Sequence, residues 1–196
     1  MIKTLLPGLF LLCSTAVLAQ QDKDTLIYNL PVVNGKLIYS GIGKAAGRNR
    51  STLDTIAKNW FHSYFKLDES SEEKAAIMPL SNDTSLFLLN NGVLGYKTKP
   101  GMVNISFVAI IRIELSCTDN YYSYKIDHIF FRPKSGALNA MGYQNDPEYL
   151  IKVYKRKHLG FWTAWNVSRG QIRDYLHNMN TAVRSCIASL NKAMVN

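Results

Sequence analysis

Residues 103–131 read VNISFVAIIRIELSCTDNYYSYKIDHIFF, two runs in which apolar and polar side chains alternate on either side of a short polar segment. Alternation with a period of two is typical of a strand that buries one of its faces. The apolar positions are every second residue from 103 to 115 and again from 122 to 130. Residues 118–120, Thr-Asp-Asn, favour a tight turn between the runs. The stretch therefore predicts a long antiparallel hairpin.

A first strand and a helix are expected upstream of this hairpin. Asn34-Gly35 is a turn signal, and residues 36–42 after it predict the first strand. From Leu53 to Phe65 apolar residues recur at spacings of three and four, which is the pattern of an amphipathic helix. We therefore predict a helix over residues 52–66, with Ser51 as its N-cap.

More strands are expected between this helix and the hairpin. Residues 75–80 and 85–89 are short apolar runs, interrupted by Pro79 and by residues 81–83, and we interpret them as one broken or bulged strand. Residues 90–92, Asn-Asn-Gly, predict a hairpin turn into a strand over residues 93–99. Together with the long hairpin these strands would form a four-stranded meander.

Two helices are expected in the last third of the chain. Asp146-Pro147-Glu148 has the sequence of a helix start, and it predicts a short helix to about residue 156. Residues 168–193 predict a long helix with one apolar seam, made of Ile172, Leu176, Met179, Val183, Cys186, Leu190 and Ala193. Such a seam suits either a coiled-coil dimer or packing on the chain's own sheet, and we favour packing because a sheet needs a cover. The fold class is then α+β, an antiparallel sheet with helices on one face.

The first 19 residues have the features of a secretory signal peptide. Lys3 supplies a positive start, residues 5–17 form an apolar segment, and Val17-Leu18-Ala19 fits a cleavage site after Ala19. A lipoprotein signal that uses Cys13 is less favoured, because leucines rather than small residues precede that cysteine. No later run is long enough to span a membrane. We expect an exported protein, in the periplasm, on the cell surface or outside the cell.

The mature chain is expected to have a polar leader over residues 20–30 and a single domain over residues 31–196, because 47% hydrophobic composition suffices for one core and no linker divides it. Without Lys3 its net charge is 22 − 14 = +8. Residues 20–131 hold twelve basic and eleven acidic residues, whereas residues 132–196 hold ten basic and three acidic ones. An anionic partner should therefore meet the last third.

Cys117 and Cys186 are candidates for a disulfide in an oxidising compartment. The alternative, which we favour, is that each packs as a small hydrophobic residue, because Cys117 ends a strand and Cys186 lies on the helical seam. Two cysteines without matching histidines are too few for a zinc site.

Four segments carry a resemblance to a known family: PVVNGKLIY at residues 31–39, IAKNWF at 56–61, GVLGYK at 92–97 and YSYKI at 122–126. The chain resembles a family of exported bacterial domains of unknown function that have a TATA-box-binding-protein-like (TBP-like) fold. The resemblance covers residues 31–131 and the final helix, so residues 133–167 would be an insertion. It implies the fold but no catalytic residue, and the TATA-box name describes shape without implying DNA binding.

No catalytic or cofactor motif stands out. Gly41, Gly43 and Gly47 invite comparison with a phosphate-binding loop, but the spacing is wrong and a flexible connection is the simpler interpretation. The four histidines, His62, His128, His158 and His177, form no metal-binding motif, and we find no nucleophile motif or carboxylate pair. We expect no cofactor and no enzymatic activity, although a constellation assembled only in space would escape this search.

The most suggestive surface residues lie in the stretch 152–165, where basic and aromatic side chains mix. The candidate contacts are Lys152, Lys155, Arg156, Lys157, Trp162 and Trp165. Such a mixture suits an anionic glycan or an anionic lipid surface, and the alternative is that the aromatic residues fill the core while the lysines face solvent. We expect no nucleic acid partner because of export, and we keep a protein partner along the last helix as the second hypothesis.

Overall fold

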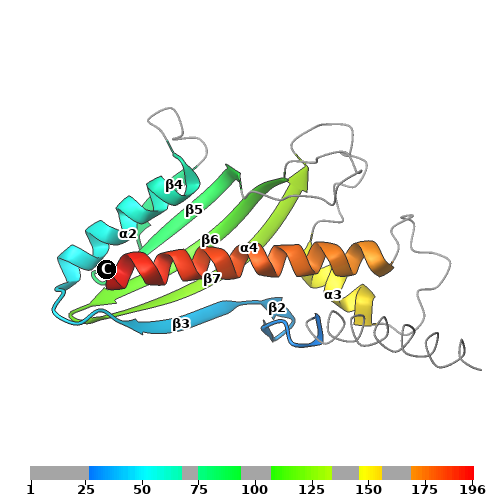
Figure 1. Ribbon diagram of the computed structural model, residues 1–196, viewed down its shortest axis with the longest axis horizontal. Helices are drawn as coiled ribbons and strands as arrows, with labels where there is room; N and C mark the ends of the chain where they lie inside the picture. The colour runs from blue at the N-terminus through cyan, green and yellow to red at the C-terminus, as the bar shows by residue number, and fades with distance from the viewer. Residues whose placement is uncertain (1–26, 68–74, 94–106, 134–145, 156–168) are drawn as a thin grey trace, which may run out of the picture.

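A five-stranded antiparallel sheet forms the centre of the fold in the computed structural model of the protein (Figure 1). The structure describes residues 27–67, 75–93, 107–133, 146–155 and 169–196. The strand order is β3-β7-β6-β5-β4. The strands are β3 (Tyr39–Lys44), β4 (Ala75–Pro79), β5 (Thr84–Val93), β6 (Phe107–Thr118) and β7 (Tyr121–Pro133).

The predicted long hairpin is confirmed as β6 and β7. The two strands pair from Thr118 and Tyr121 outward, and the turn residue Asn120 has a φ of 67°, which asparagine tolerates. One extra residue in β7, near His128 with its φ of 50°, shifts the register. Asp127 lies opposite Arg112 in the register that the turn sets, and beyond the bulge the side chains of β7 change faces.

The described residues form a four-stranded meander, β4-β5-β6-β7, but the predicted single broken strand and the predicted turn after it were wrong. Residues 75–80 and 85–89 belong to two antiparallel strands, β4 and β5, because Ser81 and its neighbours form a tight turn in which the N–H groups of Leu80 and Ser81 donate to Thr84 O. Asn90-Asn91-Gly92 is not a hairpin turn: it lies inside β5, at a register shift between Leu89 and Gly92. Of the predicted strand 93–99, residues 94–99 lie outside the described residues.

The predicted first strand is divided in two. β1 (Val32–Val33) and β2 (Lys36–Leu37) form a small hairpin around Asn34-Gly35, whose φ angles of 51° and 78° confirm the turn. After Ile38 the chain continues as β3 along β7. The position of the predicted strand over residues 36–42 is therefore confirmed, but the strand is interrupted at Ile38, between β2 and β3.

The helices are α2 (Arg50–Phe65), α3 (Pro147–Lys155) and α4 (Arg169–Val195). The predicted N-cap of α2 was wrong: the side chain of Asn49, not Ser51, accepts a hydrogen bond from Thr52 N at 2.9 Å. The start of α3 is confirmed, because Asp146 Oδ1 accepts from the N–H groups of Glu148 and Tyr149. Among the described residues no helix is both long enough and apolar enough to cross a membrane.

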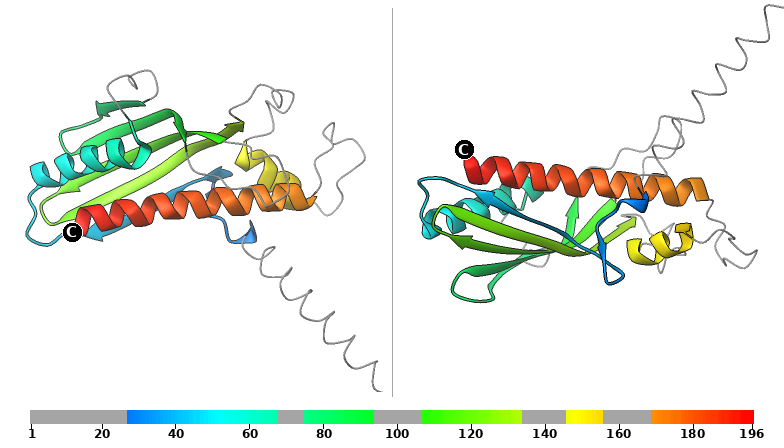
Figure 2. Two further views of the ribbon diagram at one scale, coloured as in Figure 1. Left: turned by 45° about the horizontal axis from the view of Figure 1, so that its top comes forward. Right: turned by 90° about the horizontal axis from the view of Figure 1, so that it is seen from below.

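Both α2 and α4 lie on the same face of the sheet, here called the covered face (Figure 2). α3 lies beside the first half of α4, beyond the end of the sheet (Figures 1 and 2). The indole of Trp60 in α2 donates to Ser189 Oγ of α4 at 3.2 Å. The seam of α4 is buried against the chain's own core, at Ile172, Leu176, Met179, Val183, Cys186 and Leu190. Packing of the seam on the sheet is therefore confirmed, and the seam is not free for a coiled coil.

Two glycines of β3 make room for tyrosines that reach α4. Gly41 and Gly43 pair with Tyr124 and Tyr122 of β7, and a Cβ atom on either glycine would collide with the tyrosine ring opposite. The hydroxyl of Tyr122 then donates to Asn191 Oδ1 of α4 at 2.9 Å. These glycines lie inside a strand, so neither a phosphate-binding loop nor a flexible connection describes them.

Candidate functional site

One face of α3 carries exposed basic and aromatic side chains. Lys152 and Lys155 are exposed, and Tyr149 is 44% exposed at the position three residues before Lys152. Five other residues of the helix are buried, Pro147, Leu150, Ile151, Val153 and Tyr154, and the half-buried Glu148 accepts a hydrogen bond from Leu37 N at 3.0 Å. Because residues three apart are neighbours on a helix, Tyr149, Lys152 and Lys155 form one row.

A residue from the start of the described chain joins this row. Tyr28 is 52% exposed, and Lys155 Nζ lies 5.8 Å from the centroid of its ring, within the range of a cation–π contact. We call Tyr28, Tyr149, Lys152 and Lys155 the α3 surface. Within the described part of the chain, neither lysine forms an ion pair. Their charges are therefore not neutralised by a carboxylate of those residues.

The α3 surface contains only part of the stretch that sequence singled out. Lys152 and Lys155 are exposed, as a contact with a ligand requires. Arg156, Lys157, Trp162 and Trp165 lie outside the described residues, so their part in the surface stays a prediction. Tyr28 was missed, because it lies 155 − 28 = 127 positions before Lys155 and only the fold brings the two together.

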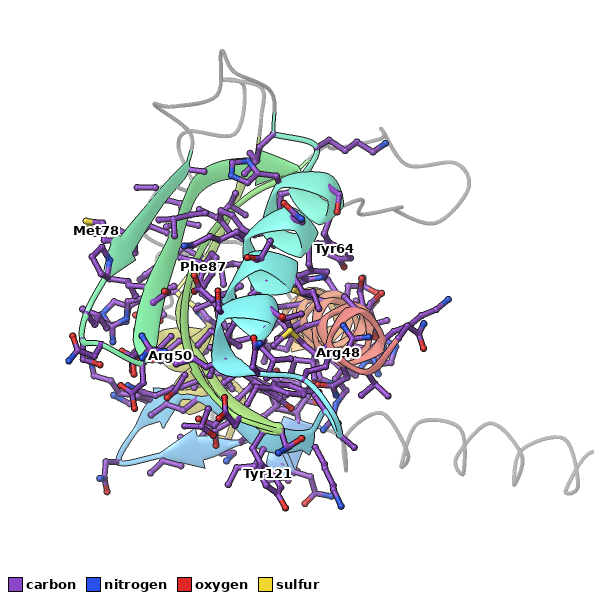
Figure 3. All side chains as sticks on the ribbon, turned by 90° about the vertical axis from the view of Figure 1, so that its left-hand side faces the viewer. Arg48, Arg50, Tyr64, Met78, Phe87 and Tyr121 are labelled. Carbon is purple, nitrogen blue, oxygen red and sulfur yellow. The ribbon has the colours of Figure 1, made fainter. Side chains whose placement is uncertain are left out.

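A polar cleft of about 460 Å³ opens at the start of α2, in the end view of Figure 3 around Arg50. Four of its charged lining side chains, Asp54, Lys58, Asp83 and Asp119, already have partners. Asp119 Oδ1 accepts from Arg50 N at 2.8 Å, and Asp54 pairs with Lys58 at 2.6 Å. Asp83 accepts from two neighbouring hydroxyl groups, which lower the pKa of its carboxyl. Asp119 thus joins the turn between β6 and β7 to α2, and Ser85 Oγ of β5 donates to Asp54 Oδ1 of α2 at 3.1 Å, so these polar groups hold the structure around the cleft together.

The face of the sheet away from α2 and α4, here called the open face, carries a network of paired charges. Arg112 makes two hydrogen bonds to the carboxylate of Asp127, at 2.6 and 2.7 Å. Lys125 Nζ lies 3.3 Å from both Asp127 and Glu114. Burial alone would raise the pKa of Asp127, but hydrogen bonds from Arg112, His128 and Lys125 hold it well below its usual range. Because these charges balance one another, the network offers little net attraction to an anion.

The histidines and acidic residues do not assemble a metal site in the described part of the chain. His62 is exposed on α2, and His128 Nδ1 lies 2.9 Å from Asp127 Oδ1. His177 Nδ1 is buried on α4 without a hydrogen-bond partner among the described residues. His158 lies outside them.

Cys117 and Cys186 are both free and buried, so the candidate disulfide is not formed. Cys117 lies near Asp54 in the first half of α2, whereas Cys186 lies near Tyr64 in the second half. Burial raises the pKa of Cys117 to about 11 and that of Cys186 to about 12, so both stay protonated thiols.

Comparison with known proteins shows the fold. No model of a protein family matches the chain, and no curated protein matches it. Among solved structures, a TBP-like protein from Parabacteroides distasonis has a TM-score of 0.58 at 14% identity, over 84% of this chain and 96% of that one. A DUF4468 family protein from Bacteroides ovatus has a TM-score of 0.57 at 13% identity, over 84% of this chain and 90% of that one. The chain has the TBP-like fold that its sequence resembled.

Proposed function

We propose that this protein is an exported binding module with no catalytic role of its own, which holds an anionic component of the cell envelope through the α3 surface. The observation that carries the proposal is the row of exposed Tyr149, Lys152 and Lys155, joined by Tyr28. Export rests on the predicted signal peptide. The TBP-like fold is consistent with a binding module but indicates no ligand.

The physical argument for an anionic surface is that two exposed lysines on a rigid helix form no ion pair with any carboxylate of the described residues. The lysines lie three residues apart on a helix whose other face is buried, so their stems are about 4.5 Å apart along the axis. Each lysine near an anionic membrane surface contributes about 1 kcal/mol of attraction. The exposed tyrosine rings add apolar area with a polar tip, a combination suited to sugars and to lipid head groups. The excess of seven basic over acidic residues in residues 132–196 gives the same end of the chain a positive field.

A protein partner along the last helix has less support. The apolar seam of α4 is buried inside the fold. Among the α4 side chains that the structure describes, those that remain exposed are Thr181, Arg184, Ser185, Ala188, Lys192 and Val195, and the only large apolar one of these, Val195, is the last residue of the helix. A partner on that helix would therefore find no apolar stripe.

The test is sedimentation of the mature protein, from Gln20 on, with vesicles. One arm uses phosphatidylcholine vesicles with about a third phosphatidylglycerol, and the other uses immobilised polygalacturonate as an anionic glycan. Lys152→Gln with Lys155→Gln is compared with Lys44→Gln and Lys192→Gln, two exposed lysines elsewhere. From about 1 kcal/mol per lysine, we expect the first pair to weaken binding about 10- to 30-fold in the arm that binds, and the control pair less than about 3-fold.

The salt dependence sharpens the same test. Binding should fall steeply from about 50 mM to 500 mM salt, because screening shortens the reach of exposed charges. A further variant, Lys155→Ala with Arg156→Ala and Lys157→Ala, extends the test to the basic run of the sequence. The proposal is rejected if retention changes neither with salt nor with these substitutions. It is also rejected if neither arm retains the protein at low salt.

A further inference from the structure

β3 is an edge strand whose free side can be identified from two hydrogen bonds. Among the described residues it pairs only with β7. Ala45 N donates toward the β7 side, to Asn120 O at 2.7 Å, whereas Ile38 N donates to the opposite side, to Pro31 O at 2.9 Å. Since the N–H and C=O groups of a strand alternate in direction, the even-numbered residues of β3 direct theirs away from the sheet. These residues are Ser40, Ile42 and Lys44.

The described residues of the chain cover only the beginning of this edge. β1 pairs with β2 through Val32 and Leu37, and its cover ends where Pro31 meets Ile38. Upstream of Pro31 the chain turns away, and Ile27 is buried in the core. The β1–β2 hairpin forms a two-stranded sheet of its own, and the edge from Ser40 to Lys44 follows it along the chain. Among the described residues no strand pairs with the outer side of this edge.

The exposed side chain of Ile42 distinguishes the β3 edge of the sheet from the β4 edge. Its side chain is 81% exposed on the open face. The opposite edge strand, β4, ends at Pro79, which cannot donate a backbone hydrogen bond and so discourages pairing with another chain. β3 contains no proline and no bulge, and a lysine only at its end. An uncovered edge with an exposed β-branched residue is a template for an added strand.

The charge around the edge indicates the kind of partner. Residues 27–50 contain Lys36, Lys44, Arg48 and Arg50 and no acidic residue. On the covered side, Arg184 of α4 is exposed and contacts Asn180, the residue that also binds the β3 tyrosine. A second copy of this chain, paired at the same edge, would place these positive charges next to the same positive charges, which repel one another. An acidic partner would neutralise them.

We propose that β3 accepts an extended acidic segment of a partner protein as an added strand. Backbone groups of Ser40, Ile42 and Lys44 pair with the segment, and its apolar side chains pack beside Ile42 on the open face. Its carboxylates lie on the other side of the added strand, toward Arg184. This surface is separate from the α3 surface, and it does not depend on the function proposed there.

The probe is a blocked peptide of alternating glutamate and valine, eight residues long, with a lysine–valine peptide of equal length as the charge control. Hydrogen exchange of the full mature protein is followed by NMR with and without the peptide. We expect the amides of Ser40, Ile42 and Lys44 to become protected by at least about 10-fold with the acidic peptide at millimolar concentration. The lysine–valine peptide should protect none of them.

Substitution at one position separates backbone pairing from side-chain contact. Ile42→Pro removes an N–H that β7 does not use, and an edge strand tolerates proline there. It should weaken peptide binding at least about 10-fold, whereas Ile42→Thr keeps the N–H and should stay within about 3-fold. A peptide with N-methyl groups on every second residue, which cannot donate on one side, repeats the test with an unchanged protein and should bind at least about 10-fold more weakly.

Several results would overturn the proposal. These are no protection of the three amides by the acidic peptide, equal binding of the acidic and basic peptides, and undiminished binding of the N-methylated peptide. Dimerisation of the protein that Ile42→Pro abolishes would make a second copy the occupant, and would overturn it as well.

Discussion

The two faces of the sheet are built from the same strands but by opposite means. On the covered face, Phe87, Ile113 and Tyr122 are buried under α2 and α4. On the open face, Arg112 pairs with Asp127, and Glu114 with Lys125, each at opposite positions of β6 and β7. Apolar burial contributes about 25 cal/mol per Å², whereas half-exposed ion pairs contribute little. Stability should therefore come from the covered face, and the open face should chiefly favour the correct pairing of strands.

The largest expected difference comes from the same truncation on the two faces. Ile113 is fully buried on the covered face, and Ile42 is 81% exposed on the open face. Ile113→Ala removes buried methyl groups and leaves a cavity, so we expect a loss of about 2–5 kcal/mol in the free energy of unfolding. Ile42→Ala should change it by less than about 0.5 kcal/mol. Urea unfolding of both variants measures the difference.

Two results would contradict the expected difference in stability between the covered face and the open face. If Ile42→Ala cost as much as Ile113→Ala, the open face would be covered in solution, for example by a second copy. A changed urea dependence in Ile113→Ala would instead indicate a change in the unfolded state or a loss of two-state behaviour.

The division of the sheet into two faces could be predicted from sequence, because alternation reports directly which side of a strand is buried. The hairpin of β6 and β7 and the seam of α4 were predicted on this ground and are confirmed. The bulge near His128 could not be predicted, because one extra residue does not visibly change a short pattern of alternating apolar residues. The error at Asn90-Asn91-Gly92 has the same cause: a turn sequence can also form an irregular site inside a strand.

The candidate site was less predictable than the fold. The exposed lysines of α3 follow from helical spacing, and sequence identified both Lys152 and Lys155. Tyr28 and the outward-directed groups of β3 depend on the tertiary arrangement, which brings distant segments together and fixes the direction of each backbone group. The positive charge around β3 can be predicted from sequence, because residues 27–50 contain no acidic residue.

A smaller effect is expected from the most buried charge of the open face. Asp127 is 6% exposed and accepts two hydrogen bonds from Arg112. Asp127→Asn keeps the shape but removes the charge, so we expect a loss of about 1.5–3 kcal/mol at neutral pH. Asp174→Asn, at an exposed ion pair on α4, is the matched control and should cost less than about 0.5 kcal/mol.

The dependence on pH has a definite sign. Because folding lowers the pKa of Asp127, its carboxylate stabilises the fold above the unfolded value of about 3.9 and loses this effect as pH falls through the folded value. The gap between the wild type and Asp127→Asn should thus be constant from about pH 5 to 8 and shrink below about pH 4. Urea titrations across that range measure it, and a gap that widened in acid would mean that folding raises this pKa instead.

The smallest expected effect tests whether the ion pairs of the open face add to the free energy of unfolding or only favour the correct pairing of the strands. Glu114 and Lys125 lie 3.3 Å apart at opposite positions of β6 and β7, and their side chains are 28% and 39% exposed. A double-mutant cycle with Glu114→Gln and Lys125→Gln should give a coupling of about 0.2–1 kcal/mol that falls as salt is added. Asp127 also contacts Lys125, so the cycle repeated in Asp127→Asn shows how much of the coupling the network adds. A coupling above about 2 kcal/mol, unchanged by salt, would mean that the open face is shielded from water, and the contrast between the two faces would fail.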